Sequence, residues 1–186
     1  MYKLVKRADL SDLIIIGVIV SHIGWVFETL MFYFMYGGIH DRGFISLPFC
    51  PIYGITIIAV YILIGTPRGG GIILGRLSPT GLRMVLYYLL ASIIPATFEF
   101  VGGEVMEWAS GEVLWSYEAY KYSFGKYACL EIALGWGIAI FLFMCIFEPL
   151  LSQIRKIPRR QSKILACVLF LAIALDFVIT LCKSAI

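Results

Sequence analysis

The order of apolar and polar positions along the chain predicts five membrane-spanning helices. Long apolar stretches with few charges cover about residues 13–36, 49–65, 82–101, 127–151 and 164–181. A helix needs roughly 20 apolar residues to cross a bilayer. The second stretch is the shortest of the five. Because lipid offers the backbone no hydrogen-bond partner, each stretch is expected to be helical. We therefore predict an all-α, polytopic membrane bundle of about five helices, with residues 1–186 forming a single integral membrane domain.

The composition supports lipid as the solvent for much of this chain. Of its 186 residues 61% are hydrophobic and the mean hydropathy is +0.92, whereas soluble domains are about half apolar. No Lys/Arg-rich run is interleaved with aromatic residues, so nucleic acid is not an expected partner. The five cysteines form no CxxC pair and no framework spacing. The sequence therefore indicates no disulfide scaffold, no metal site and no cofactor.

Lysine and arginine are distributed unequally between the two sides of the predicted bundle. Eleven lie before the first stretch or in the loops that share its side, and four lie on the other side; the eleven are Lys3, Lys6, Arg7, Arg68, Arg76, Arg83, Arg155, Lys156, Arg159, Arg160 and Lys163, and the four are Arg42, Lys121, Lys126 and Lys183. Positive charge favours the cytoplasmic side of a membrane. The N-terminus is thus predicted to be cytoplasmic and the C-terminus outside.

Polar and helix-breaking residues gather in "DRGFISLPFCPIYG", residues 41–54, on the predicted outer side. Pro48 and Pro51 cannot continue a helix from upstream. Non-helical backbone at membrane depth is tolerated only where it is buried in protein or lines a wet cavity. We expect an irregular, re-entrant segment that enters the outer half of the bundle before a short second helix.

Acidic side chains from several predicted helices fall in the same outer half of the membrane. Glu28, Glu99, Glu131 and Asp176 each come from a different stretch, and Glu107 lies two turns beyond Glu99. Ionisable residues inside a span are costly and are functional candidates for that reason. Glu99 and Glu107 would be about 12 Å apart along a helix, so each acid is expected to need its own partner.

Two interpretations of these acids remain open on the sequence. In the first, Arg42 and Lys126 neutralise Glu28 and Glu99 and hold loops against the bundle, while Trp115 and Tyr117 belong to an interfacial aromatic belt. In the second, the acids form an outward-facing pocket for a small cation, an amine or a proton, with cation–π attraction from aromatic rings. The candidate substrate-binding residues are Trp25, Glu28, Arg42, Cys50, Tyr53, Glu99, Glu107, Lys126, Glu131 and Trp136.

Four motifs give the chain a family resemblance. They are "GWVFETL" at 24–30, "DRGFISLPFCPIYG" at 41–54, "FEFVGGEVMEW" at 98–108 and "LWSYEAYKYSFGKYACLEIALGWG" at 114–137. In this order they resemble the bacterial ABC-transporter type IV permease family, the CmpB-like integral membrane proteins. The resemblance implies a transport function and a bacterial plasma-membrane location.

The chain lacks the GxxxxGK[ST] phosphate loop of an ATPase. The Gly-rich "TPRGGGIILGR" at 66–76 is expected to be a flexible cytoplasmic turn. A separate ATPase subunit would therefore have to supply ATP hydrolysis, and a homo-oligomer is the other way to complete a pathway through so small a bundle.

The leading interpretation is accordingly a small permease or transport-associated subunit in the lipid bilayer. One alternative is an intramembrane enzyme acting on lipid or cell-wall intermediates. In that case Glu28, Glu99 and Glu107 would supply acid/base chemistry, Arg42 would bind a phosphate and Cys50 would be a nucleophile. The other alternative is a non-catalytic assembly or sensory subunit in which the polar residues form a rigid, ion-paired cluster.

Overall fold

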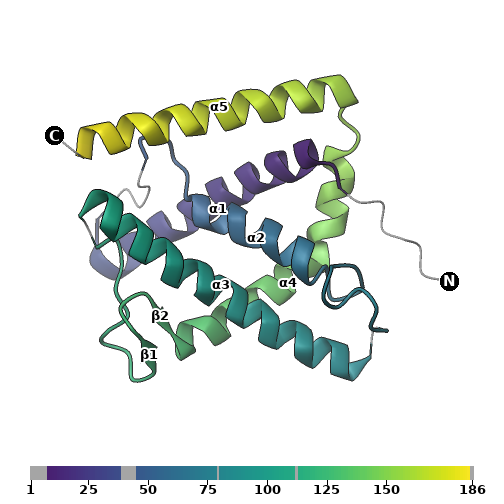
Figure 1. Ribbon diagram of the computed structural model, residues 1–186, viewed down its shortest axis with the longest axis horizontal. Coiled ribbons are helices and arrows are strands. Elements are labelled where there is room, and N and C mark those ends of the chain that lie inside the picture. Colours follow the sequence, from purple (N-terminus) through teal and green to yellow (C-terminus); the bar gives the residue numbers. More distant parts are fainter. Residues whose placement is uncertain (1–7, 39–44, 79, 112, 185–186) are drawn as a thin grey trace. The chain divides into compact units, whose positions relative to one another are not determined.

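The computed structural model describes residues 8–38, 45–78, 80–111 and 113–184. In this part of the chain five helices and one short hairpin follow each other (Figure 1). Their bounds are α1 Leu10–Tyr36, α2 Pro51–Leu63, α3 Gly81–Ser110, β1 Ser123–Phe124, β2 Ala128–Cys129, α4 Leu130–Ile154 and α5 Arg159–Ser184. The predicted all-α fold is confirmed, and α3 extends well beyond the apolar stretch that predicted it.

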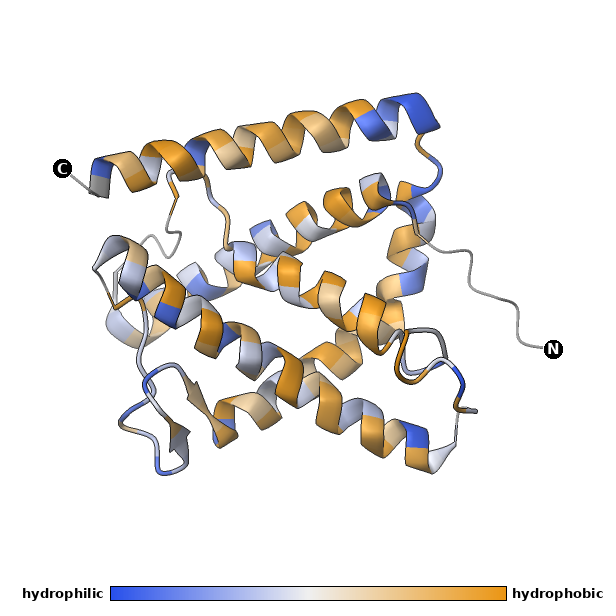
Figure 2. Cartoon of the chain, viewed as in Figure 1, coloured by the Kyte–Doolittle hydropathy of each residue, from blue (hydrophilic) through white to orange (hydrophobic). Residues whose placement is uncertain are grey.

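The lengths of the helices agree with a multi-pass membrane protein. In the described chain α1, α3, α4 and α5 are long and apolar enough to cross a bilayer, and apolar residues dominate their surfaces (Figure 2). The 13 residues of α2 rise only about 20 Å, less than the ~30 Å of a hydrocarbon core. The prediction of a shortened second helix is therefore confirmed.

Residues 8–55 and 151–184 form one compact unit. Its main contact is between α1 and α5, which run side by side (Figure 1). The first turn of α2 also packs closely on α1: a Cβ placed on Gly54 would lie 2.3 Å from the carbonyl oxygen of Gly17. The absence of a side chain at Gly54 thus lets the two backbones approach.

The non-helical segment 45–50 is bonded to the middle of both long helices of this unit. The backbone N–H of Cys50 donates to the carbonyl of Ser21 (3.2 Å), and His22 Nδ1 lies 2.9 Å from the carbonyl oxygen of Pro48. On the other side, the N–H of Leu47 donates to Asp176 Oδ2 of α5 (2.8 Å). The predicted irregular segment therefore lies against the central turns of two spans, where its polar backbone is satisfied by protein rather than by lipid.

Residues 56–150 form the second compact unit. Here α3 and α4 cross closely, because Gly137 of α4 has no side chain: a Cβ there would lie 2.1 Å from Ser92 Oγ. The hydroxyl of Tyr88 donates to the carbonyl of Leu134 across the same contact (3.2 Å). The β1–β2 hairpin pairs Ser123 with Cys129 and leads directly into α4.

The loop between α2 and α3 is folded around one arginine. Arg83 is 0% exposed, and its guanidinium donates to backbone carbonyls of the loop, including those of Thr66 (3.0 Å) and Leu74. Tyr87 adds a hydrogen bond to the carbonyl of Gly65 (3.1 Å). The Gly-rich stretch is thus a compact turn with satisfied carbonyls, more ordered than the flexible turn expected from its glycines.

Candidate functional site

In the first unit a tyrosine–glutamate pair sits on a glycine of α1. The hydroxyl of Tyr53 donates to Glu28 Oε1 (2.7 Å). The Tyr53 ring lies where a side chain of residue 24 would be, since a Cβ on Gly24 would be 2.4 Å from its Cγ. Gly24 and Glu28 are four residues apart, so they share one helix face. The glycine admits the ring, and the ring then directs its hydroxyl at the carboxylate one turn further along.

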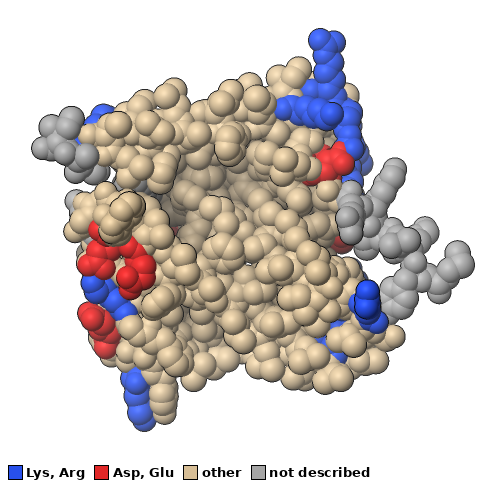
Figure 3. Space-filling view, in the orientation of Figure 1, with Lys and Arg blue, Asp and Glu red and all other residues tan. Residues whose placement is uncertain are grey.

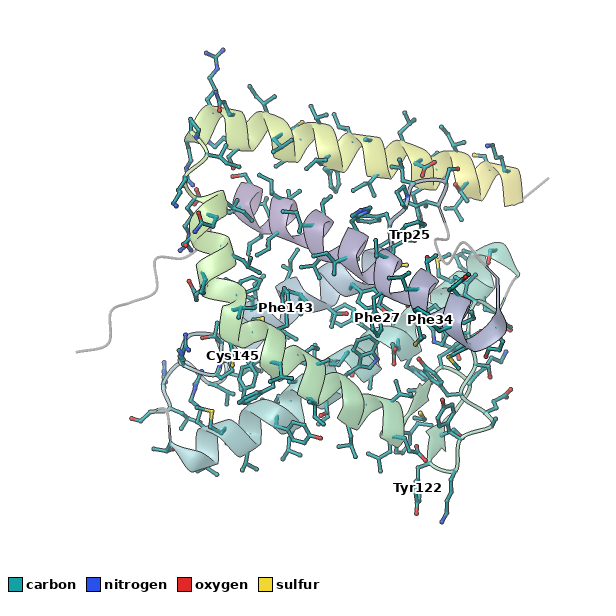
Figure 4. The ribbon with its side chains drawn as sticks, turned by 180° about the vertical axis from the view of Figure 1, so that it is seen from behind. Trp25, Phe27, Phe34, Tyr122, Phe143 and Cys145 are labelled. Atoms are coloured by element: carbon teal, nitrogen blue, oxygen red, sulfur yellow. The ribbon has the colours of Figure 1, made fainter. Side chains whose placement is uncertain are left out.

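Trp25 and Cys50 are two other predicted site residues of this unit. Trp25 stacks with His22, with ring centroids 6.1 Å apart, and Figure 4 shows Trp25 on α1. Cys50 is 7% exposed and immediately precedes α2. His22 is therefore engaged by Trp25 on one helix and by the carbonyl of Pro48 in segment 45–50.

In the second unit the same arrangement recurs on α3. The hydroxyl of Tyr127 donates to Glu107 Oε2 (2.5 Å), and a Cβ on Gly103 would lie 2.2 Å from the Tyr127 Cγ. Here a cation joins the pair, because Lys126 Nζ donates to both oxygens of Glu107 (2.7 and 2.8 Å). Lys126 thus bonds Glu107, whereas the sequence had suggested Glu99 as its acid.

Two titrating groups of this cluster lie in the loop before α4, outside the spans. The hydrogen bond to Glu107 raises the pKa of Lys126 above its ordinary value. Burial raises the pKa of the Tyr127 hydroxyl, and the bond to Glu107 adds to this effect. Burial also raises the pKa of the Cys129 thiol, which keeps it protonated and weakly nucleophilic at neutral pH. Lys126 and Tyr127 therefore keep their protons at neutral pH.

Glu99 lies two turns nearer the middle of α3 and has different neighbours. It is 8% exposed. The Trp136 indole N–H donates to its Oε1 (2.8 Å), and the Tyr117 hydroxyl donates to the same atom (3.2 Å). Both donors are neutral, and they come from α4 and from the loop that carries the hairpin. Glu99 and Glu107 thus have separate partners, as their predicted separation required.

The remaining two acids bind backbone. Glu131, exposed in the first turn of α4, accepts a hydrogen bond from the N–H of Tyr122 (3.3 Å), and Tyr122 projects from the hairpin loop (Figure 4). Asp176 accepts the N–H of Leu47, as described above. A carboxylate near a helix N-terminus is favourable, so Glu131 stabilises the start of α4 as well as the loop.

The predicted acids are therefore divided between the two units. Glu28 and Asp176 belong to the first, and Glu99, Glu107 and Glu131 belong to the second. Arg42, the predicted common cation, lies outside the described residues. A single pocket that joins all of these acids stays a prediction.

Sequence reasoning missed that two tyrosines donate hydrogen bonds to acids of α3. Tyr117 was placed in an interfacial belt by one interpretation and considered for cation–π attraction by the other, and Tyr127, which is 0% exposed, was taken as the start of a span. A signal existed in the spacing Gly103-x3-Glu107, because it repeats Gly24-x3-Glu28. In each case a tyrosine follows in the next segment, close to a cysteine, and its ring occupies the space over the glycine.

Comparison with known protein families shows to which family the chain belongs. Residues 15–181 match the family described as "Putative ABC-transporter type IV", ABC_trans_CmpB. The chain belongs to this family. The match includes most of both units and at least part of every described helix, and it confirms the family suggested by the four motifs. Among curated proteins and among solved structures, no match to the chain was found.

Together the family and the helices identify a multi-pass membrane protein associated with transport. The family description names an ABC-transporter type, which suggests an ATPase and membrane lipid as partners.

Proposed function

We propose that the chain is a small permease or transport-associated subunit in which Glu99 binds a small cation, an amine or a proton. The observation that carries this proposal is the position of Glu99: its side chain is almost fully buried in a membrane span and is held by two neutral donors. Membership of the transporter family supports the same function.

The chemistry of these donors favours ligand binding at Glu99. The Trp136 indole and the Tyr117 hydroxyl are neutral donors that orient the carboxylate. An ionised carboxylate inside a span is costly and marks ion or proton pathways by default. A small cation or a proton that reaches Glu99 offsets this cost, and the face of the Trp136 ring can add cation–π attraction.

Glu107 has a different role in this proposal. Lys126 and Tyr127 already neutralise and satisfy its carboxylate, so it holds the hairpin loop against α3. The loop in turn carries Tyr117 to Glu99. For Glu107 the first interpretation of the acids applies, in which a cation neutralises the acid and holds a loop against the bundle. In the proposal this ion pair positions the ligand site at Glu99.

Glu28 is the second ligand candidate, because Tyr53 orients its carboxylate within a span. Arg42, Trp25, Cys50 and Glu131 are the further candidate residues of the proposed outward-facing pocket. The proposed setting is the bacterial plasma membrane with the N-terminus cytoplasmic. A separate ATPase or a second copy of the chain would supply the coupling and complete the pathway.

The test compares two glutamates of α3. Glu99→Gln removes the charge of the buried acid, and Glu104→Gln does the same at an exposed position of the same helix. Thermal unfolding of the purified chain is followed in rising sodium, potassium or methylammonium chloride and over a pH series, with N-methylglucamine chloride to hold ionic strength. We expect one cation or the proton to raise the midpoint of the wild type and of the Glu104→Gln variant, with no response from Glu99→Gln.

Flux gives the functional arm of this test. Pyranine-loaded proteoliposomes report proton movement driven by the cation that binds. We expect Glu99→Gln to abolish this flux and Glu104→Gln to retain it. A midpoint that responds equally in the wild type and in Glu99→Gln would contradict the proposed role of Glu99.

A further inference from the structure

A pocket of about 500 Å³ lies between the start of α1 and the start of α5. Both helices belong to the same unit. This volume is within the ~300–1,000 Å³ that is typical of ligand pockets. The apolar part of its wall comes from Ile14 of α1 and from Ala166 and Phe170 of α5. The pocket is separate from the glutamate clusters described above.

The opposite end of the pocket is polar. Asp9 and Arg159 form an ion pair there, and Lys163 lies one turn further along α5. Lys163 makes no hydrogen bond or ion pair with any residue that the structure describes. Because Arg159 is already engaged by Asp9 and lies 3.8 Å from Asp12, the ammonium group of Lys163 is the charge that remains to meet a ligand.

The charge around this polar end is positive. The segment from residue 155 to residue 163 holds five cations, Arg155, Lys156, Arg159, Arg160 and Lys163. Of the charged residues that line the pocket, Asp9 is acidic and Arg159 and Lys163 are basic, which leaves one positive charge. Figure 3 shows Lys and Arg gathered where α5 begins, with acidic atoms beside them. An anionic ligand complements this field.

We propose that the pocket binds one anionic phospholipid of the surrounding membrane. The phosphate accepts a hydrogen bond from Lys163, and an acyl chain lies along Ile14, Ala166 and Phe170. Lys163 and Phe170 are seven residues apart on α5, which is about 10 Å of helix rise. Over this distance the pocket wall changes from a charged side chain to apolar side chains. A lipid at a bilayer surface makes the same change, from its charged head group to its acyl chains. Basic pockets between spans on the cytoplasmic side bind anionic head groups in this way.

The test uses the full chain in a neutral detergent and native mass spectrometry. Phosphatidylglycerol and phosphatidylcholine with identical acyl chains are titrated onto the wild type, Lys163→Gln and Lys183→Gln. The last variant removes the same charge from the other end of α5. We expect one phosphatidylglycerol to be preferred by the wild type, a roughly tenfold weaker affinity in Lys163→Gln, since a charge-assisted hydrogen bond is lost, and no change in Lys183→Gln.

Two further arms separate a lipid site from a free-phosphate site and from bulk charge. sn-Glycerol 3-phosphate carries the anion without acyl chains, and we expect it not to displace the bound lipid at millimolar concentration. Cys167→Trp fills the exposed part of the pocket wall, and we expect it to weaken lipid binding while circular dichroism confirms the fold. Equal affinity for the two lipids, equal losses in the two lysine variants or displacement by glycerol phosphate would each overturn the proposal.

Discussion

The α1 and α3 regions use the same small arrangement at different depths. In each, a glycine and a glutamate four residues apart share a helix face, and a tyrosine from the following segment covers the glycine and donates to the glutamate. On α1 the tyrosine comes from the first turn of α2. On α3 it comes from the hairpin loop, near the C-terminal end of the helix, and a lysine joins it.

The difference shows how the position of a carboxylate along its span decides whether a cation from a loop can reach it. Glu107 is near the end of its span, where a lysine from the loop can bond it while remaining partly exposed. Glu28 lies two turns before the end of α1, where the Tyr53 hydroxyl of α2 bonds it. A cation for Glu28 would have to be carried inward by the re-entrant segment, which is the role that the sequence predicted for Arg42.

The largest effect is expected from filling the two glycines. Gly24→Ala and Gly103→Ala would each place a Cβ within 2.4 Å of a tyrosine ring, and the ring would have to move away from its glutamate. Overpacking of this kind costs about 1–3 kcal/mol. We expect each variant to lower the thermal unfolding midpoint by about 2–12 °C, at roughly 2–4 °C per kcal/mol for a chain of this size.

Gly135→Ala is the matched control for both variants. Nothing lies within 4 Å of a Cβ at Gly135 of α4, and alanine has the higher helix propensity. We expect an unchanged or slightly raised midpoint. If all three variants behave alike, the tyrosine rings do not depend on the glycines, and the equivalence of the two regions fails.

The same two regions show what the sequence could and could not predict. Hydropathy predicted the number and type of the helices, because lipid leaves the backbone only one favourable form; of the five, four are long enough to cross a bilayer. The acids were found because charge in a span is exceptional. The hydrogen bonds from Tyr117 and Tyr127 were not predicted, since tyrosine is ordinary near membrane surfaces and only the tertiary contact distinguishes a donor to Glu99 from a member of the aromatic belt.

The burial of Arg83 is a feature that the sequence could not predict. Its charge helped to predict the orientation of the chain, but its burial among the carbonyls of the α2–α3 loop had no local signal. Glycines in the loop pointed to flexibility. The partner that orders them lies several residues away on α3, so only the folded chain reveals the compact turn.

A smaller effect would show whether Arg42 does for Glu28 what Lys126 does for Glu107. The unfolding midpoint is measured for Glu28→Gln, Arg42→Gln and their double variant, and for the corresponding Glu107 and Lys126 set. Removing one member of a partly buried pair leaves an uncompensated charge, whereas removing both does not. We expect each double variant to be less destabilised than the sum of its single variants.

Additive losses in the first set, together with non-additive losses in the second, would restrict the cation to the α3 region. The Lys126 set is the internal standard here, because its ion pair is described at 2.7 Å. Coupling in both sets would make the two regions equivalent in charge as well as in geometry.

The smallest effect is a dependence on alkaline pH that only the α3 region should show. The folded state raises the pKa of Lys126, mainly through Glu107, and that of Tyr127, mainly through burial. Both groups are protonated in the folded and unfolded chain below their ordinary pKa values of about 10, so their contribution to stability is fully present there. Above that range the unfolded chain releases these protons first, and the contribution is lost as the pH rises through the folded-state values.

We expect the unfolding midpoint to fall between about pH 10 and 11 in the wild type and to fall less in Lys126→Gln. Lys121→Gln, which removes a lysine from the same loop, should keep the wild-type slope; an equal slope in both variants would show that the Glu107 cluster is not the source of the dependence.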